Sequence, residues 1–77
     1  MADNRVEVEI GGQKLVLRTK NSPEYITELA RYVDVKISAI AQRNPRLSIS
    51  QQALLAAINL ADEIHKKDSP ETGRRSD

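Results

Sequence analysis

The sequence predicts an α+β fold in which a β-hairpin is followed by two α-helices, a ββαα unit that dimerises. Three observations predict it. Two runs of alternating apolar and polar residues flank a pair of glycines, which is typical of a hairpin. Two longer stretches then repeat their apolar residues at helical spacing. The second of these stretches is apolar around more of its circumference than a 77-residue chain can cover, which favours a dimer.

The predicted hairpin covers residues 5–19. Strict alternation on both sides of Gly11 and Gly12 is the period of strands with one buried face, and both central residues of a type I′ turn need positive φ. Counting outward from the turn gives three cross-strand pairs: Glu9–Lys14, Val8–Leu15 and Val6–Leu17. The apolar pairs share one face and the charged pair lies on the other, so turn and pattern predict the same register.

The first predicted helix covers residues 23–43. Ser22 is a favoured N-cap and Pro23 is tolerated in the first turn, while Pro45 disfavours helix for the residue before it. A stripe about 120° wide collects the residues expected to face the core: Ile26, Leu29, Ala30, Val33, Ile37, Ile40 and Ala41. Tyr25 and Tyr32 flank this stripe.

The second predicted helix covers residues 49–67, with Ser48 and Gln51 spaced as a capping box. Its apolar residues sweep roughly 200° of the helical wheel, about twice what a one-sided surface helix needs. A second copy would cover the remainder across a twofold interface. The expected interface residues are Leu54, Ala57, Ile58, Asn59, Ala61 and Ile64. Asn59 lies at the rim, where it either sets the register of the dimer or is an ordinary exposed residue.

Composition excludes the usual ways of stabilising so small a domain. The chain has no cysteine, and His65 is its single histidine, so neither disulfides nor a conventional metal site is expected. Phe and Trp are absent, which leaves a core of small aliphatic residues. Oligomerisation is the remaining source of stability. We expect the flanking residues 1–4 and 68–77 to be disordered, because they lack apolar side chains in periodic order.

The sequence lacks the parts of an enzyme. His65 has no cysteine to activate and is explained by its place near a helix C-terminus. Asp62 and Glu63 are adjacent, so they point about 100° apart on a helix rather than facing each other. We expect no catalysis, cofactor, metal or small-molecule substrate. No run of 18 apolar residues exists and the N-terminus is polar, so neither membrane insertion nor a secretory signal is expected.

A DNA-binding role is the main alternative from another functional class. Ribbon-helix-helix regulators are also dimers with one strand and two helices per subunit, and they read the major groove of DNA with their strands. Here two strands form a hairpin within one chain, and the first presents Glu7 and Glu9 outward. Carboxylates have the wrong sign for phosphate, and a net charge of +1 gives no basic surplus, so no nucleic-acid partner is expected. A dimerisation module with an unrelated partner is a third interpretation.

Three sequence segments, in this order, resemble the ZapA family of bacterial cell division proteins across about residues 5–67. They are Val6-Glu7-Val8-Glu9-Ile10-Gly11-Gly12, Tyr32-Val33-Asp34 and Ala56-Ala57-Ile58-Asn59-Leu60-Ala61-Asp62-Glu63-Ile64. The resemblance implies a dimeric ββαα head in the cytoplasm at the division septum. It also implies binding to FtsZ that aligns or bundles FtsZ filaments in the Z-ring.

The same resemblance implies a partner-binding surface around the hairpin turn and the start of the second helix. On this sequence it points to Gln13, Lys14, Arg46 and Gln51, with Arg43 beside them in the interhelix loop. Without the resemblance, Arg43 and Arg46 would be interpreted as solvated loop charges. In family members the second helix typically continues into a coiled coil that joins two dimers. Pro70 and a polar segment follow here, so we expect head dimers that cross-link filaments poorly, with some bridging through two identical faces.

Overall fold

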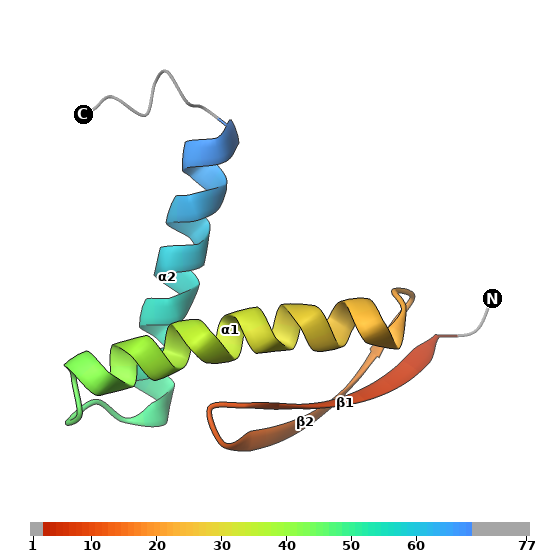
Figure 1. Cartoon of the computed structure of the whole chain (residues 1–77), viewed down its shortest axis with the longest axis horizontal. Coiled ribbons are helices and arrows are strands. Elements are labelled where there is room, and N and C mark those ends of the chain that lie inside the picture. Colours follow the sequence, from red (N-terminus) through yellow and green to blue (C-terminus); the bar gives the residue numbers. More distant parts are fainter. Residues whose placement is uncertain (1–2, 69–77) are drawn as a thin grey trace.

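The computed structural model describes residues 3–68 of the chain. Its elements follow one another as β1 (Asn4–Ile10), β2 (Gln13–Thr19), α1 (Pro23–Arg43) and α2 (Ile49–Asp68). The hairpin lies along one half of α1, and α2 crosses the other half at a steep angle (Figure 1). This order confirms the predicted α+β hairpin and helix pair.

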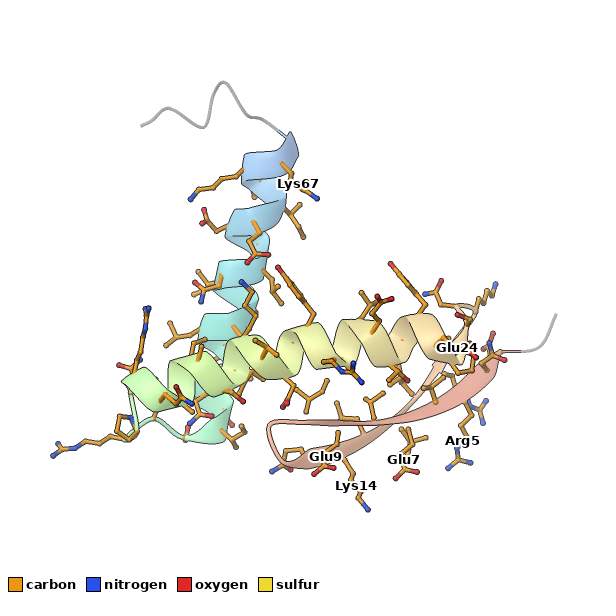
Figure 2. The ribbon with its side chains drawn as sticks, in the orientation of Figure 1. Arg5, Glu7, Glu9, Lys14, Glu24 and Lys67 are labelled. Atoms are coloured by element: carbon orange, nitrogen blue, oxygen red, sulfur yellow. The ribbon has the colours of Figure 1, made fainter. Side chains whose placement is uncertain are left out.

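The hairpin has the register that its sequence pattern predicts. β1 and β2 are antiparallel, with Val6 opposite Leu17, Val8 opposite Leu15 and Glu9 opposite Lys14. Gly11 and Gly12 have φ values of 59° and 78°, the positive values that a type I′ turn requires. The outward side chains of Arg5, Glu7, Glu9 and Lys14 point away from α1 (Figure 2).

The hairpin begins one residue earlier than predicted. Asn4, which we assigned to the disordered N-terminal segment, pairs with Thr19, and its side-chain amide donates a 2.7 Å hydrogen bond to the carbonyl of Asn21. This second bond is made by a side chain to a loop backbone, which alternation alone does not predict. At the other end, α2 extends to Asp68, one residue beyond the predicted end. The disorder predicted for residues 1–2 and 69–77 lies outside the described residues.

Both helices begin with side-chain caps. The Oγ of Ser22 accepts a 3.1 Å hydrogen bond from the amide of Tyr25, and Pro23 occupies the first turn of α1. At the start of α2, the amide of Gln51 donates to Oγ of Ser48 at 3.2 Å, and the amide of Ser48 donates to Oε1 of Gln51 at 3.1 Å. This reciprocal pair is the predicted capping box.

The core consists of two small clusters on either end of α1. The first contains Val6 and Val8 of β1 packed against Ile26 and Ala30 of α1. The second lies where α2 crosses α1 and contains Ile37, Ile40 and Ala56, with Ile10, Val33 and Leu47 packed against it. Ala56 is 1% exposed, because a small side chain lets the two helices approach closely at the crossing.

One residue of the predicted core stripe on α1 is misplaced. Leu29 is exposed, although its position on the helical wheel is inside the apolar arc. The hairpin covers α1 at Ile26 and Ala30, and α2 covers it at Ile37 and Ile40. Leu29 lies between these contacts on a side that neither element reaches.

Candidate functional site

A row of apolar side chains runs along α2 without any covering element. Leu54 is 66% exposed and Ile58 is 63% exposed, and Ala57, Ala61 and Ile64 are exposed as well. All six predicted interface residues, Asn59 included, face solvent in the single chain. The five apolar members lie within about 120° of one another at 100° per residue, so they form one face. We refer to this face as the α2 row.

A second apolar surface lies on α1, where sequence analysis expected core or flanking residues. Tyr25, Leu29, Tyr32 and Val35 are all exposed on this helix. Their spacing of three and four residues places them on one side, away from the hairpin. This surface was missed because helical periodicity shows that a face is apolar, but not which neighbour covers it.

A groove of about 780 Å³ joins the two surfaces in the angle between α1 and α2. Its apolar lining comes from Leu29, Tyr32, Val33, Leu60 and Ile64. Glu63, Lys66 and Lys67 supply the charged part of its lining. The groove thus combines an apolar lining with a few charged residues, a composition that suits the apolar face of a helix better than a small polar substrate.

Tyr32 and Glu63, which line this groove, form a polar cluster with Lys36. The Tyr32 hydroxyl donates a 2.6 Å hydrogen bond to Oε1 of Glu63. The Lys36 ammonium forms an ion pair with Oε2 of Glu63 and lies 5.3 Å from the centre of the Tyr32 ring. The cluster connects the middle of α1 to the last turns of α2, so it helps to set the angle between the helices.

Hydrogen bonding within the cluster shifts the pKa values of all three groups. The bond from Lys36, followed by the bond from Tyr32, lowers the pKa of Glu63 below its ordinary value. The hydrogen bond from Lys36 to Glu63 raises the pKa of Lys36, and the hydrogen bond from Tyr32 to Glu63 raises the pKa of Tyr32. By its sequence position alone, Glu63 is half of an adjacent carboxylate pair with Asp62. Its actual partners are far away in sequence, which no local pattern could indicate.

The hairpin turn lies against both helices. The Gly11 amide donates a 2.7 Å hydrogen bond to Oδ1 of Asp34 on α1. A Cβ added to Gly11 would lie only 2.8 Å from Cδ1 of Ile49, the first residue of α2. The turn and the entrance of α2, which are 38 residues apart in sequence between Gly11 and Ile49, are therefore neighbours in space.

The predicted partner-binding residues divide into two groups. All four residues of the first group are exposed: Gln13 and Lys14 begin β2 beside the turn, Arg43 is the last residue of α1, and Arg46 lies in the interhelix loop. Gln51 is exposed too, but its amide oxygen already accepts the bond that caps α2. Its principal contact is therefore structural.

Within residues 3–68 no group of three or more His, Cys, Asp or Glu side chains gathers where it could hold a metal ion. Neither helix in this part of the chain is long and apolar enough to cross a membrane.

Comparison with protein families and known sequences places these features in context. The family model described as "Cell division protein ZapA" matches residues 6–77. The cell division protein ZapA of Halalkalibacterium halodurans is 36% identical over 62 residues, which cover 80% of this chain and 68% of that protein. ZapA of Geobacillus thermodenitrificans is 39% identical over 62 residues, with the same coverage of 80% and 68%.

A solved structure shares the arrangement of the elements. The structure described as a ZapA mutant dimer from Geobacillus stearothermophilus matches with a TM-score of 0.74 and 29% sequence identity. The match covers 97% of this chain and 87% of that chain.

Proposed function

The chain belongs to the ZapA family of cell division proteins, and from this premise we propose that it is a homodimeric, non-enzymatic accessory protein that binds FtsZ. In this role it aligns or bundles FtsZ filaments and so steadies the Z-ring at the cytoplasmic division septum. Its activity is binding, through surfaces that are presented in duplicate by the dimer.

The uncovered apolar surface is the observation that carries this proposal. The groove shares Ile64 with the α2 row and shares Leu29 and Tyr32 with the exposed face of α1, on two helices that cross at a steep angle (Figure 1). Burying one large aliphatic side chain stabilises a structure by about 1.5–3 kcal/mol. A surface with several such side chains favours association, and the similarity to a ZapA structure described as a dimer supports a second copy as the occupant.

The dimer that fits this surface is twofold symmetric. In a twofold interface both copies use the same residues, so each copy packs against the groove of the other. Leu54 and Ile58 on α2 are then buried against the partner, as are Leu29 and Tyr32 on α1. Asn59 is exposed about 100° around the helix from Ile58, outside the α2 row, so it can affect the register only at the periphery of this interface.

FtsZ binding is assigned to the exposed residues around the turn and the interhelix loop. Gln13, Lys14, Arg43 and Arg46 supply amide and cationic groups outside the apolar surface. The contact between Gly11 and Ile49 supports a single binding region, because it brings the turn close to the entrance of α2. Two such regions on a dimer can engage two FtsZ subunits, and the linkage raises the effective affinity.

Co-sedimentation with FtsZ polymer tests the proposal. We expect the chain to pellet with polymerised FtsZ and to remain in the supernatant with unpolymerised FtsZ. Random duplex DNA at moderate salt serves as the second arm, because retention that falls steeply with salt would indicate phosphate binding. Absence of enrichment in the polymer pellet would reject FtsZ as the partner and favour a dimerisation module with another partner.

The ribbon-helix-helix alternative is not favoured. β1 pairs with β2 of the same chain, so it is not available as the shared ribbon of that class. Glu7 and Glu9 also point outward from the hairpin (Figure 2), where they would face phosphates.

A further inference from the structure

The outer edge of β2 is unpaired along its whole length. The sheet has two strands, and no other strand of residues 3–68 joins it. In a two-residue hairpin the residues that flank the turn exchange hydrogen bonds, and bonded and non-bonded pairs then alternate. The observed register therefore directs the backbone of Gln13, Leu15 and Leu17 toward β1. The backbone groups of Lys14, Val16 and Arg18 point to the free edge.

The apolar face beside this edge is only half covered. Val8 and Leu15 are paired across the sheet, yet Val8 is 8% exposed and Leu15 is 47% exposed. The difference arises because the buried cluster joins α1 to β1, and Leu17 is the residue of β2 that packs against it. Val16, on the opposite face of β2, is also exposed. An added strand could make apolar contacts with Leu15 and Leu17 and hydrogen bonds with the free backbone groups of Val16.

The charged side chains at this edge favour an added strand of negative charge. Glu9 lies opposite Lys14 in the register, but within residues 3–68 neither Lys14 nor Arg18 forms an ion pair with a carboxylate. Arg18 is directly opposite Arg5 in the sheet, and like charges at that position destabilise the pair. A carboxylate placed beside Arg18 would offset this repulsion. The edge therefore favours an acidic partner.

The same charges oppose a second copy at this edge. In a twofold antiparallel pairing centred on Val16, Lys14 of one chain would lie opposite Arg18 of the other. Both such contacts join like charges, a common way of blocking edge-to-edge association. The edge and the dimer surface on α1 and α2 are thus separate sites.

We propose that the outer edge of β2 binds an extended acidic segment of a partner protein, which adds to the sheet as a third strand. Carboxylates of that segment lie beside Lys14 and Arg18, and its alternate aliphatic side chains lie beside Leu15 and Leu17. Main-chain hydrogen bonds supply affinity, and the alternation supplies specificity. This site shares Lys14 with the surface that we assign to FtsZ, and it goes beyond the proposed function because neither dimerisation nor that surface requires a strand paired with the edge of β2.

Titration of the full chain with a short peptide, followed by amide NMR, tests the site. The probe is acetyl-Gly-Glu-Val-Thr-Val-Glu-Gly-amide, which pairs its Thr with Val16 and its two Glu with Lys14 and Arg18. We expect slower hydrogen exchange at Lys14, Val16 and Arg18 on binding. The amides of Leu15 and Leu17 are already bonded within the hairpin and should change little. A probe with Lys in place of Glu, and one N-methylated at Thr, should both bind more weakly.

Val16→Pro and Val16→Thr are the matched variants. The Val16 amide points outward, so proline there removes an edge donor while leaving the hairpin ladder intact. Retained protection at Leu15 and Leu17 verifies that the variant is folded. We expect Val16→Pro to weaken probe binding by about three- to tenfold and Val16→Thr to bind within about twofold of the parent.

Several results would overturn strand addition at β2. The first is that the peptide does not bind at millimolar concentration. The second is that slower amide exchange appears at Arg5, Glu7 and Glu9 of β1 instead. The third is that the N-methylated peptide binds as tightly as the unmodified one. Equal binding by the Pro and Thr variants would do the same. Co-sedimentation of Val16→Pro with FtsZ polymer reports separately on the proposed function, because its outcome does not depend on the peptide.

Discussion

The hydroxyl of Tyr32 donates a 2.6 Å hydrogen bond to Glu63, joining α1 to α2 across 31 residues of sequence. Lys36 holds the other oxygen of the same carboxylate. Tyr32 and Glu63 both line the groove between the helices, so their hydrogen bond helps to shape the surface on which we expect the second copy to pack.

The pH dependence of stability should report this cluster. The pKa of Glu63 is lowered from 4.5, so its contribution is present above that value and is lost as the pH falls through its lower folded pKa. The pKa values of Tyr32 and Lys36 are raised from 10.0 and 10.5, so their contributions are lost only as the pH rises through still higher values. We expect Glu63→Gln to be less stable than the parent at pH 7, with the difference shrinking toward pH 3.

Urea unfolding at one fixed protein concentration measures this difference. Asp62→Asn is the control, because Asp62 pairs with Lys66 on the same helix and does not touch α1. A constant gap between Glu63→Gln and the parent from pH 7 to pH 3 would contradict the assignment.

The two turn glycines should differ in their tolerance of alanine. Both have positive φ, so each substitution should cost about 1–2 kcal/mol of folding free energy. Gly11→Ala should cost more, because its Cβ would meet Cδ1 of Ile49, whereas a Cβ at Gly12 meets no atom within 4 Å. The excess should decrease in an Ile49→Val background, which lacks that methyl group. Thermal or urea unfolding of the four variants measures the coupling, and equal costs at Gly11 and Gly12 would refute the proposed contact.

A charge introduced on the α2 row should weaken dimerisation and should not directly unfold the single chain. Leu54 and Ile58 of this row are the positions at which we would introduce such a charge. Both residues are exposed in the single chain, so the charge would be buried only in the dimer. We expect Ile58→Asp to shift sedimentation equilibrium from dimer toward monomer, with any unfolding following from lost association. Gln42→Asp, on an exposed part of α1, should remain dimeric, and a dimeric Ile58→Asp would refute the interface.

Reversal of charge in the interhelix loop should weaken partner binding without affecting the fold. Arg46 is exposed, and neither ion pair of residues 3–68 includes it. We expect Arg46→Glu to reduce co-sedimentation with FtsZ polymer while changing the free energy of unfolding by less than about 0.5 kcal/mol. A large loss of stability would assign Arg46 a structural role instead.

Gln51 should show the opposite behaviour. Its side chain completes the capping box with Ser48, so Gln51→Ala should destabilise the chain by about 0.5–2 kcal/mol. Gln51→Glu retains an acceptor at this position and should restore most of that loss. If both variants unfold like the parent but bind FtsZ more weakly, Gln51 belongs with the partner contacts after all.

Local patterns in the sequence were sufficient to determine the elements of this protein. Period-two alternation around Gly11 and Gly12 determined the hairpin register, and Ser22, Ser48 and Pro45 determined where helices begin and end. These signals act through backbone geometry and hydrogen bonds between near neighbours, so they can be read without knowing the fold. The family resemblance rests on the same segments, whose individual roles the sequence did not explain.

Only the tertiary structure decided which apolar residues are covered and which polar residues meet. Leu29 and Leu15 belong to apolar faces by pattern, yet both are exposed, because no element packs on that side of α1 and because α1 packs mainly against β1 rather than β2. Glu63 meets Tyr32, and Asp34 meets Gly11, through the crossing of α2 and the docking of the turn. Periodicity specifies the direction of a side chain from its own helix or strand. The crossing angle and the reach of the neighbouring element, which come from packing the whole chain, determine what that side chain contacts.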